Sequence, residues 1–284
     1  MTPRESIVVA GDQKHLLGIL TEPEYATAVG APTVLFLTAG LLHKPGPFRM
    51  HTTLARRLAV HGIRSCRFDQ SGRGDSDRPG TQESDLQLAH SDISSIMTAL
   101  EGNDKKTFIL CGLCSGADDI LLTMSEDSRI VGAVFFDAIC HPTPRFLFDR
   151  YVRRAFSLGR WIRLGKRWLS KWWGTSAEQT NSEDLYSRTF PPRSKITQCL
   201  TSFLRRRAKL LFVFTGGITE YMTYQNQFRD AYGSFDNDEC LSTVYFPEAD
   251  HTYSHIAARN KMMAQVEHWV LRSFVDERTN EPCP

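Results

Sequence analysis

A cysteine occupies the centre of a glycine-flanked pattern that could hold a nucleophile. The segment Gly112-Leu113-Cys114-Ser115-Gly116 follows the apolar residues 107–111 and precedes residues compatible with a helix. This is the context of a nucleophile elbow, a tight strand-to-helix turn in which glycines two residues to either side of the nucleophile prevent collisions. Serine usually occupies that position, but this chain has a cysteine there. As a thiolate, Cys114 would attack an acyl carbonyl. The alternative is a turn that is merely packed with small residues.

A cysteine nucleophile needs a general base, and His251 is the best-placed histidine. It follows the expected last strand, 242–246, in a loop that would face the elbow across the carboxyl edge of a parallel sheet. His43 and His141 lie in loops from which either could touch a substrate, while His255 would cap or pack a helix. We therefore expect His251 to take the thiol proton.

Two carboxylates compete to orient this histidine. Glu220 is the only acid in the turn after the expected strand 210–215, and Asp137 ends the apolar strand 130–136. A carboxylate at the end of a buried strand is costly unless something pairs with it, which favours Asp137. For each acid, the alternative is a loop carboxylate bound by backbone amides or by an arginine.

The elbow also predicts two backbone donors for a developing oxyanion. One is the N–H of Ser115, directly after the nucleophile, and the other is the N–H of Leu41 in the loop after strand 33–37. We read the glycine-rich segment 72–76 as a structural turn. The chain carries no Walker pattern or Rossmann glycine fingerprint, so we expect no nucleotide cofactor.

The composition is that of a globular protein from a reducing compartment. The chain has 284 residues, 41% of them hydrophobic, with a net charge of +2 and seven cysteines. The cysteines are scattered without a C-x-x-C pair, which argues against disulfides and a zinc site. No signal-type segment and no apolar stretch of about 20 residues is present, so the cytoplasm is the expected location.

These residues need a scaffold, and the chain supplies alternating strands and helices. The expected strands are 6–10, 16–21, 33–37, 63–68, 107–111, 130–136, 210–215 and 242–246, and the expected helices are 48–60, 86–100, 118–124, 221–232 and 256–274. Such alternation predicts an α/β fold with a mostly parallel eight-stranded sheet. It stops at 141–207, where we expect a helical lid between strands six and seven. The core would then comprise 1–140 and 208–276, followed by a tail, 277–284.

The chain resembles the α/β-hydrolase fold over nearly its whole length. The elbow, the loop 68–76 and the late turn 248–252 occur in that superfamily's order. More narrowly, segments 39–41, 112–118 and 227–230 resemble cysteine-nucleophile members found beside exosortase systems and in natural-product gene clusters. The haloalkane-dehalogenase branch is similar in placing its acid at the end of strand six, about two dozen residues after the nucleophile. The resemblance implies acyl chemistry at Cys114 but leaves the acyl group open.

The expected lid carries a strong excess of positive over negative charge. Residues 141–209 include 16 Lys and Arg against four Asp and Glu, interleaved with aromatic side chains. Such a surface could receive an acidic acyl carrier protein, the phosphates of a coenzyme A thioester, or an anionic membrane. The simpler alternative is that long arginine side chains cover apolar surface. Nothing in the sequence points to nucleic acid.

Together these features predict an acyl-enzyme mechanism for a small acyl substrate. Cys114, His251 and Asp137 (or Glu220) would form the triad of a thioesterase, or of another hydrolase or acyltransferase, acting on a thioester or activated ester. A Dieckmann-type cyclase releasing a carrier-bound chain would use the same triad. The non-enzymatic alternative is a binding module that docks a partner through the basic segment.

Overall fold

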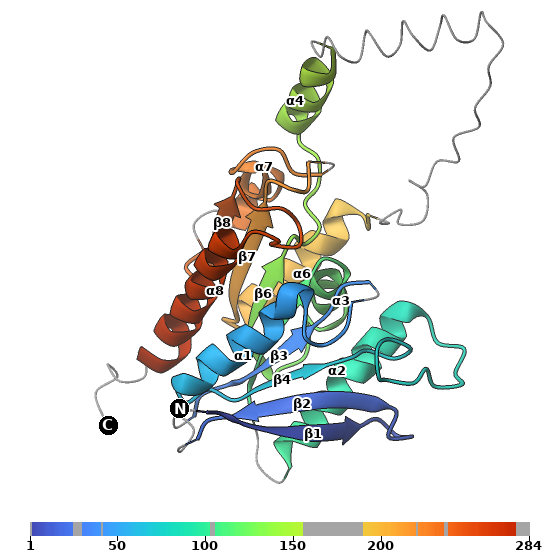
Figure 1. Ribbon diagram of the computed structural model, residues 1–284. Helices are drawn as coiled ribbons and strands as arrows, with labels where there is room; N and C mark the ends of the chain where they lie inside the picture. The colour runs from blue at the N-terminus through green and yellow to red at the C-terminus, as the bar shows by residue number, and fades with distance from the viewer. Residues whose placement is uncertain are drawn as a thin grey trace, which may run out of the picture.

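The computed structural model describes residues 2–24, 30–40, 42–102, 106–155, 190–219, 221–235 and 238–276 (Figure 1). The strands are β1 (Arg4–Ala10), β2 (Leu16–Glu22), β3 (Thr33–Leu37), β4 (Ser65–Phe68), β5 (Phe108–Leu113), β6 (Ile130–Phe136), β7 (Lys209–Thr215) and β8 (Leu241–Phe246). The α-helices are α1 (Met50–Val60), α2 (Asp85–Glu101), α3 (Ser115–Thr123), α4 (Pro144–Ala155), α6 (Arg193–Arg205), α7 (Gln227–Ala231) and α8 (Ile256–Leu271). Short 3-10 turns cover Pro47–Arg49 and Gly233–Phe235, and a π-helical turn, Arg272–Asp276, follows α8.

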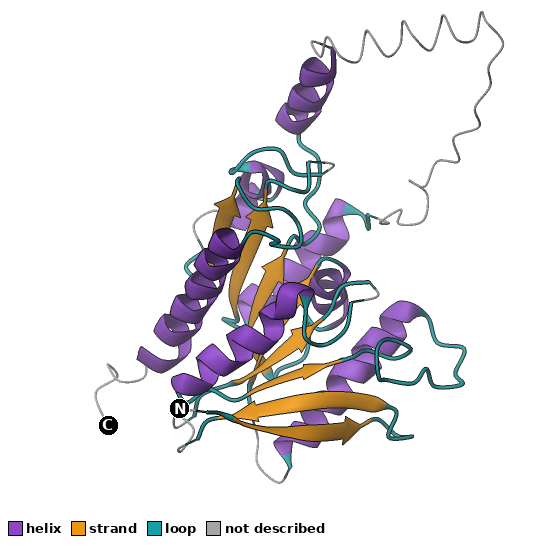
Figure 2. Cartoon of the chain, viewed as in Figure 1, coloured by secondary structure: helices purple, strands orange, loops and turns teal. Residues whose placement is uncertain are grey.

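The predicted eight-stranded, mostly parallel sheet is confirmed. The strand order is β1-β2-β4-β3-β5-β6-β7-β8, in which β2 is antiparallel to both of its neighbours and all other pairs are parallel. Parallel strands place their carboxyl ends at one edge, so the loops after β3, β5, β6, β7 and β8 gather there (Figure 2).

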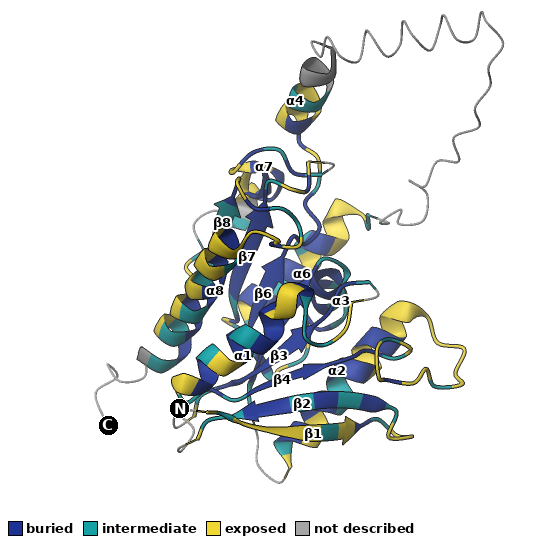
Figure 3. Ribbon diagram, viewed as in Figure 1, coloured by how far each residue is buried: buried dark blue, intermediate teal, exposed yellow. Residues whose placement is uncertain are grey.

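The central strands are buried on both faces, which explains their unbroken apolar sequences. On β3, Val34 and Phe36 belong to the core beneath α1 and α8, whereas Leu35 and Leu37 belong to the core shared with α2, α3 and α6. Alternate side chains of one strand therefore feed two cores. Figure 3 shows this burial in the middle strands and the exposure of β1 at the sheet's edge.

The expected insertion at 141–207 requires a correction at its end. Helix α6 buries Ile196, Leu200 and Phe203 in the core beside α3, so it is part of the sheet's covering layer. The apolar residues of α6 have the spacing of a core-facing helix. The basic residues around α6 nevertheless led to its assignment to the expected lid, so the end of the lid was placed too far along the chain. Helix α4 lies within the segment expected to form the lid, and residues 156–189 lie outside the described part of the chain, so the lid itself stays a prediction.

Two other helices differ from expectation in length. The helix expected at 221–232 is the single short helix α7, Gln227–Ala231, and α3 begins at Ser115, three residues earlier than expected. Within the described residues, no helix is both long enough and apolar enough to cross a membrane.

Candidate active site

Cys114 lies on a sharp turn between β5 and α3. Its φ is 51°, a left-handed conformation that costs a non-glycine residue roughly 1–3 kcal/mol, and its N–H donates to the Phe136 carbonyl at 2.8 Å. A Cβ added to Gly112 would lie 2.5 Å from Gly116, and a Cβ added to Gly116 would lie 2.6 Å from the Thr38 carbonyl oxygen. Both glycines are therefore required by the close approach of strand and helix.

The imidazole of His251 lies between a carboxylate and the Cys114 thiol. Its Nδ1 is 2.7 Å from Oδ2 of Asp137, and the ring also interacts with the Cys114 side chain. Asp137 is completely buried, while 31% of the His251 side chain is exposed. The structure thus brings together three residues from the loops after β5, β6 and β8.

Asp137 is held by the end of the neighbouring strand β7. The Thr215 N–H donates to Oδ1 at 2.7 Å, and the Thr215 hydroxyl donates to Oδ2 at 2.8 Å. The N–H of Asp137 donates in turn to the Val213 carbonyl at 2.9 Å. These bonds satisfy a carboxylate that is otherwise cut off from water, and they fix which oxygen faces His251.

The electrostatics of His251 favour a charged ring. Burial by itself lowers the pKa of His251, but its hydrogen bonds with Asp137 and Cys114 raise the pKa to about 10. At neutral pH the ring therefore favours its charged form, with a proton on each nitrogen.

Gly217 allows the His251 loop to approach β7. A Cβ on Gly217 would lie 2.5 Å from the backbone nitrogen of His251, which real Cβ atoms do not tolerate. Two consecutive glycines after a strand, Gly216 and Gly217, indicate a close approach of another backbone segment. The sequence did not indicate that this segment is the loop that carries His251.

Ser115 connects the nucleophile turn to the loop after β3. Its hydroxyl oxygen accepts the Gly40 N–H at 2.9 Å, and Gly40 itself has a φ of 51°. The Gly40 N–H is therefore already bonded. Of the two backbone donors predicted for the oxyanion, only the Ser115 N–H, at the start of α3, belongs to the described residues. The predicted second donor, Leu41, and the alternative acid, Glu220, lie outside the described residues.

Accessibility separates Cys114 from the other described cysteines. Cys114 is partly exposed, whereas Cys66, Cys111, Cys140, Cys199 and Cys240 are buried. Burial raises the pKa of the Cys66 and Cys140 thiols to about 12, and it raises the pKa of the Cys111 thiol as well. Thiolate chemistry at neutral pH is therefore disfavoured at these buried positions.

The two loop histidines considered as alternatives lie outside this trio. His43 is exposed, and both ring nitrogens of His141 are engaged, by the Tyr232 hydroxyl and by the Pro191 carbonyl. Within the described residues, no group of three or more His, Cys, Asp or Glu side chains could hold a metal ion.

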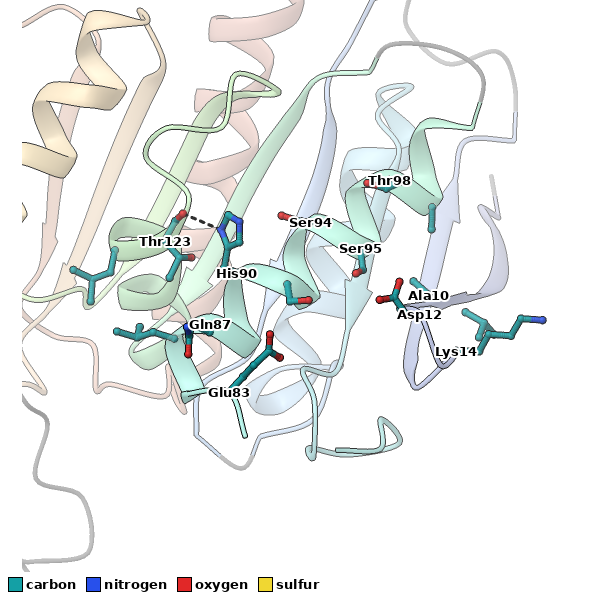
Figure 4. A pocket seen from close by; sticks show the side chains of 16 residues that line it. Ala10, Asp12, Lys14, Glu83, Gln87, His90, Ser94, Ser95, Thr98 and Thr123 are labelled. Carbon is teal, nitrogen blue, oxygen red and sulfur yellow. Dashed lines mark hydrogen bonds between the residues drawn. The ribbon is translucent and has the colours of Figure 1, made fainter. Parts of the chain in front are cut away.

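A cavity of about 1020 Å³ lies far from the thiol, at the opposite end of α3. Residues of the β1–β2 turn, α2 and the end of α3 line it, and His90 points to the Thr123 carbonyl there at 3.1 Å (Figure 4). Thr123 is the last residue of α3, while Cys114 precedes its first. This cavity contains none of the three residues described above.

Comparison with known proteins supports the fold. No protein-family model and no curated protein matches the chain. Solved structures do match the chain. Dienelactone hydrolase from Anabaena variabilis matches with a TM-score of 0.57 and 14% identity, over 96% of this chain and 100% of the other. The α/β hydrolase GrgF from Penicillium sp. sh18 matches with a TM-score of 0.59 and 14% identity, over 96% of this chain and 99% of the other. The esterase domain of a Rhodothermus marinus protein matches with a TM-score of 0.57 and 16% identity, over 95% of this chain and 99% of the other. The chain therefore has the α/β-hydrolase fold.

Proposed function

We propose that the protein is a cysteine-dependent acyl-transfer enzyme that hydrolyses, or transfers the acyl group of, a thioester or activated ester. The observation that carries this proposal is the His251 ring, which is bonded to a buried carboxylate and also interacts with a partly exposed thiol. A nucleophile, a base and a group that orients the base are the parts that acyl-enzyme catalysis requires.

In the first half of the proposed reaction, the Cys114 thiolate attacks the carbonyl carbon and the carbonyl electron pair moves to oxygen. The Ser115 N–H, at the start of α3, is the donor that faces the resulting oxyanion. When the tetrahedral intermediate collapses, the bond to the leaving group breaks and the His251 imidazolium gives its proton to that group. The product is a thioester at Cys114 and a neutral imidazole.

In the second half, water or another acceptor attacks this thioester. His251 removes the acceptor's proton, and the departing Cys114 thiolate restores the original ion pair. Asp137 keeps the proton on Nδ1 throughout, so that Nε2 faces the thiol and the acceptor. The same residues therefore serve hydrolysis and transfer, and access of water decides between them.

A thiolate favours thioesters and activated esters over ordinary esters. Thiols are good nucleophiles near neutral pH, but a tetrahedral intermediate formed from an alkyl ester tends to expel the thiolate again, since alkoxide is the poorer leaving group. The matched structures include a dienelactone hydrolase and an esterase domain, which is compatible with acyl chemistry on this fold.

The test is intact-mass analysis after exposure to a panel of acyl thioesters and activated esters. We expect one acyl adduct, on Cys114, that disappears in Cys114→Ala and persists in the matched variant Cys240→Ala, because Cys240 is buried. Release of the adduct in water and in the presence of an added thiol distinguishes hydrolysis from transfer. Labelling that is unchanged in Cys114→Ala would remove the assignment, as would turnover without loss in that variant.

A further inference from the structure

The loop after β4 encloses a buried carboxylate that the mechanism above does not use. This loop, residues 69–76, begins with Asp69, whose side chain is completely buried. It contains two glycines in left-handed backbone, Gly72 with a φ of 71° and Gly74 with a φ of 55°, and a Cβ on Gly74 would overlap the Asp69 carboxylate. The chain therefore folds tightly around a negative charge, which is costly unless partners compensate it.

The partners of this carboxylate come mainly from the loop after β3. The Lys44 backbone N–H donates to Oδ1 of Asp69 at 2.5 Å, and the Lys44 ammonium donates to Oδ2 at 2.7 Å. The ammonium also bonds the Asp75 carboxylate, and the Asp75 N–H donates to Oδ2 of Asp69 at 3.1 Å. Burial by itself lowers the pKa of Lys44, but its bonds with Asp69 and Asp75 leave that pKa raised, so Lys44 is charged at neutral pH.

The loop after β3 also contacts the nucleophile turn. Its Gly40 N–H donates to the Ser115 hydroxyl oxygen at 2.9 Å, and Ser115 directly follows Cys114. Gly40 precedes Lys44 by only four positions. This short segment is therefore fixed at both ends, at one end by Ser115 and at the other by Asp69.

The loop after β4 holds α3 as well. The Gln70 side-chain amide donates to the Asp119 carboxylate at 3.0 Å, and Asp119 lies one helical turn beyond Ser115 on α3. Because Asp69 and Gln70 are adjacent, one short stretch of backbone sets the separation between the loop after β3 and the first turns of α3.

This separation matters for the proposed reaction because an oxyanion must fit at the nucleophile turn. The Ser115 N–H is the donor proposed to face that oxyanion, and the loop after β3 is bonded to the same residue. Such donors act on charge that develops in the transition state, so a misplaced donor lowers kcat more than it changes KM. A buried ion pair is often no more stabilising than apolar side chains of the same volume, whereas its directed bonds fix one geometry.

We propose that Asp69 is a positioning residue for acyl transfer, which acts through Lys44 to hold the loop after β3 where the oxyanion at Ser115 requires it. This inference rests on the proposed function and adds a residue to that site. Both carboxylate oxygens of Asp69 face N–H donors. An amide at this position therefore leaves one donor without an acceptor in either orientation.

Asp69→Asn is the first test, with turnover of the butyryl thioester of N-acetylcysteamine followed by loss of thioester ultraviolet absorbance. We expect kcat to fall about tenfold and KM to change by less than about twofold, because a small shift of the loop misplaces the groups around the oxyanion. Asp75→Asn is the matched control. It also removes a carboxylate from Lys44, but that carboxylate is exposed and does not bond the loop's backbone, so kcat should stay near the wild-type value.

A second pair of variants leaves the carboxylate intact. Gly74→Ala places a methyl group against Asp69, whereas Gly72→Ala places one 3.2 Å from the flexible Arg78 side chain. Both glycines have a positive φ, so both variants strain the backbone. Gly74→Ala should reproduce the loss of kcat, and Gly72→Ala should not. Equal losses of kcat in the two glycine variants, or a rise of KM alone in Asp69→Asn, would overturn the positioning role.

An analogue of the tetrahedral intermediate gives a readout that loss of stability alone would not move. Trifluoromethyl propyl ketone carries the butyryl chain, and addition of the Cys114 thiolate to its carbonyl carbon places the electron pair on oxygen, as in the proposed reaction. Its inhibition constant should rise about tenfold in Asp69→Asn, in step with the loss of kcat. An unchanged inhibition constant in that variant would overturn the role of Asp69 in holding the oxyanion.

Amide hydrogen exchange at Gly40 distinguishes failure of this inference from failure of the proposed function. Exchange of the Gly40 N–H should be about tenfold faster in Asp69→Asn than in wild type, and unchanged in Asp75→Asn. Faster exchange with no turnover by wild type would keep the role of Asp69 in fixing this loop and refute the acyl-transfer reaction. Turnover by wild type with an unchanged kcat in Asp69→Asn would refute the inference alone.

Discussion

Replacing Asp137 by Asn tests the proposed relay most directly, because the surrounding bonds dictate how an amide must lie. Oδ1 accepts from the Thr215 backbone N–H, which can only donate, so the asparagine oxygen must stay at that position. The NH₂ group then replaces Oδ2, 2.7 Å from Nδ1 of His251. The Thr215 hydroxyl, 2.8 Å away, can rotate to accept the second amide hydrogen.

This arrangement reverses the tautomer of His251. A donor at the Oδ2 position forces Nδ1 to accept, so the ring proton moves to Nε2, which faces Cys114. The ring can then no longer take the thiol proton. Loss of the carboxylate charge also removes the contribution of Asp137, one of the two residues that raise the pKa of His251 to about 10. We expect acylation of Cys114 to slow by about 10³- to 10⁴-fold, the scale of tautomer loss in a nucleophile–histidine–aspartate triad.

The assay is the single-turnover rate of Cys114 acylation by mass spectrometry, with the His251 ring titrated by NMR in the same protein. Thr215→Val is the matched control, since it removes one bond to Asp137 and leaves the carboxylate, the backbone bond and the tautomer in place. It should cost at most about tenfold, the worth of one charge-assisted hydrogen bond. An Asp137→Asn protein that melts like wild type, keeps a His251 pKa near 10 and acylates at the wild-type rate would refute the reasoning.

Three further outcomes follow from the site. Gly217→Ala should displace the His251 loop and slow acylation at least tenfold, since a shift of about 1 Å can cost about 10²-fold. Ser115→Ala should leave the Gly40 N–H without its acceptor and lower the acylation rate about fivefold, or about 1 kcal/mol, in the same single-turnover assay. Because the folded-state pKa of His251 is raised from 6.5 to about 10, its contribution to stability is full below pH 6.5 and is lost as pH rises through 10. The melting temperature of wild type should therefore fall more across that window than that of Cys114→Ala, in which one partner of the ring is missing.

Gly233→Ala is the control for the Gly217 variant. A Cβ at Gly233 would meet nothing within 4 Å, so activity should be unchanged. Comparable losses in the two variants would contradict the steric argument for Gly217, and an unchanged rate in Ser115→Ala would contradict the tie to Gly40. A wild-type melting curve that is flat between pH 6.5 and 10 would contradict the linkage to His251.

The sequence indicated the three residues of the site because each stands beside a local signal. Cys114 has glycines at fixed spacing, Asp137 ends an apolar strand, and His251 follows the last strand. Parallel pairing then brings strand ends together, so the edge of the sheet could be predicted without knowing the exact contacts. The central strands were predictable because their apolar sequences reflect burial on both faces.

What escaped prediction depends on contacts between distant segments. That Thr215 would hold Asp137 depends on the pairing of β6 with β7, and no local pattern encodes that register. The Ser115–Gly40 bond joins residues 75 positions apart. Helix α6 was assigned to the insertion because its charge resembled that of its neighbours, although Ile196, Leu200 and Phe203 already had the spacing of a core-facing helix.

The order in which the site's residues are synthesised has a consequence for the nascent chain. Cys114 leaves the ribosome long before β8 and the loop that carries His251, and β8 pairs only with β7, so the imidazole arrives after almost all of the sheet. Until then the thiol has no basic partner. Under the proposed mechanism, the Cys114 thiol therefore gains its base only in the final stage of folding.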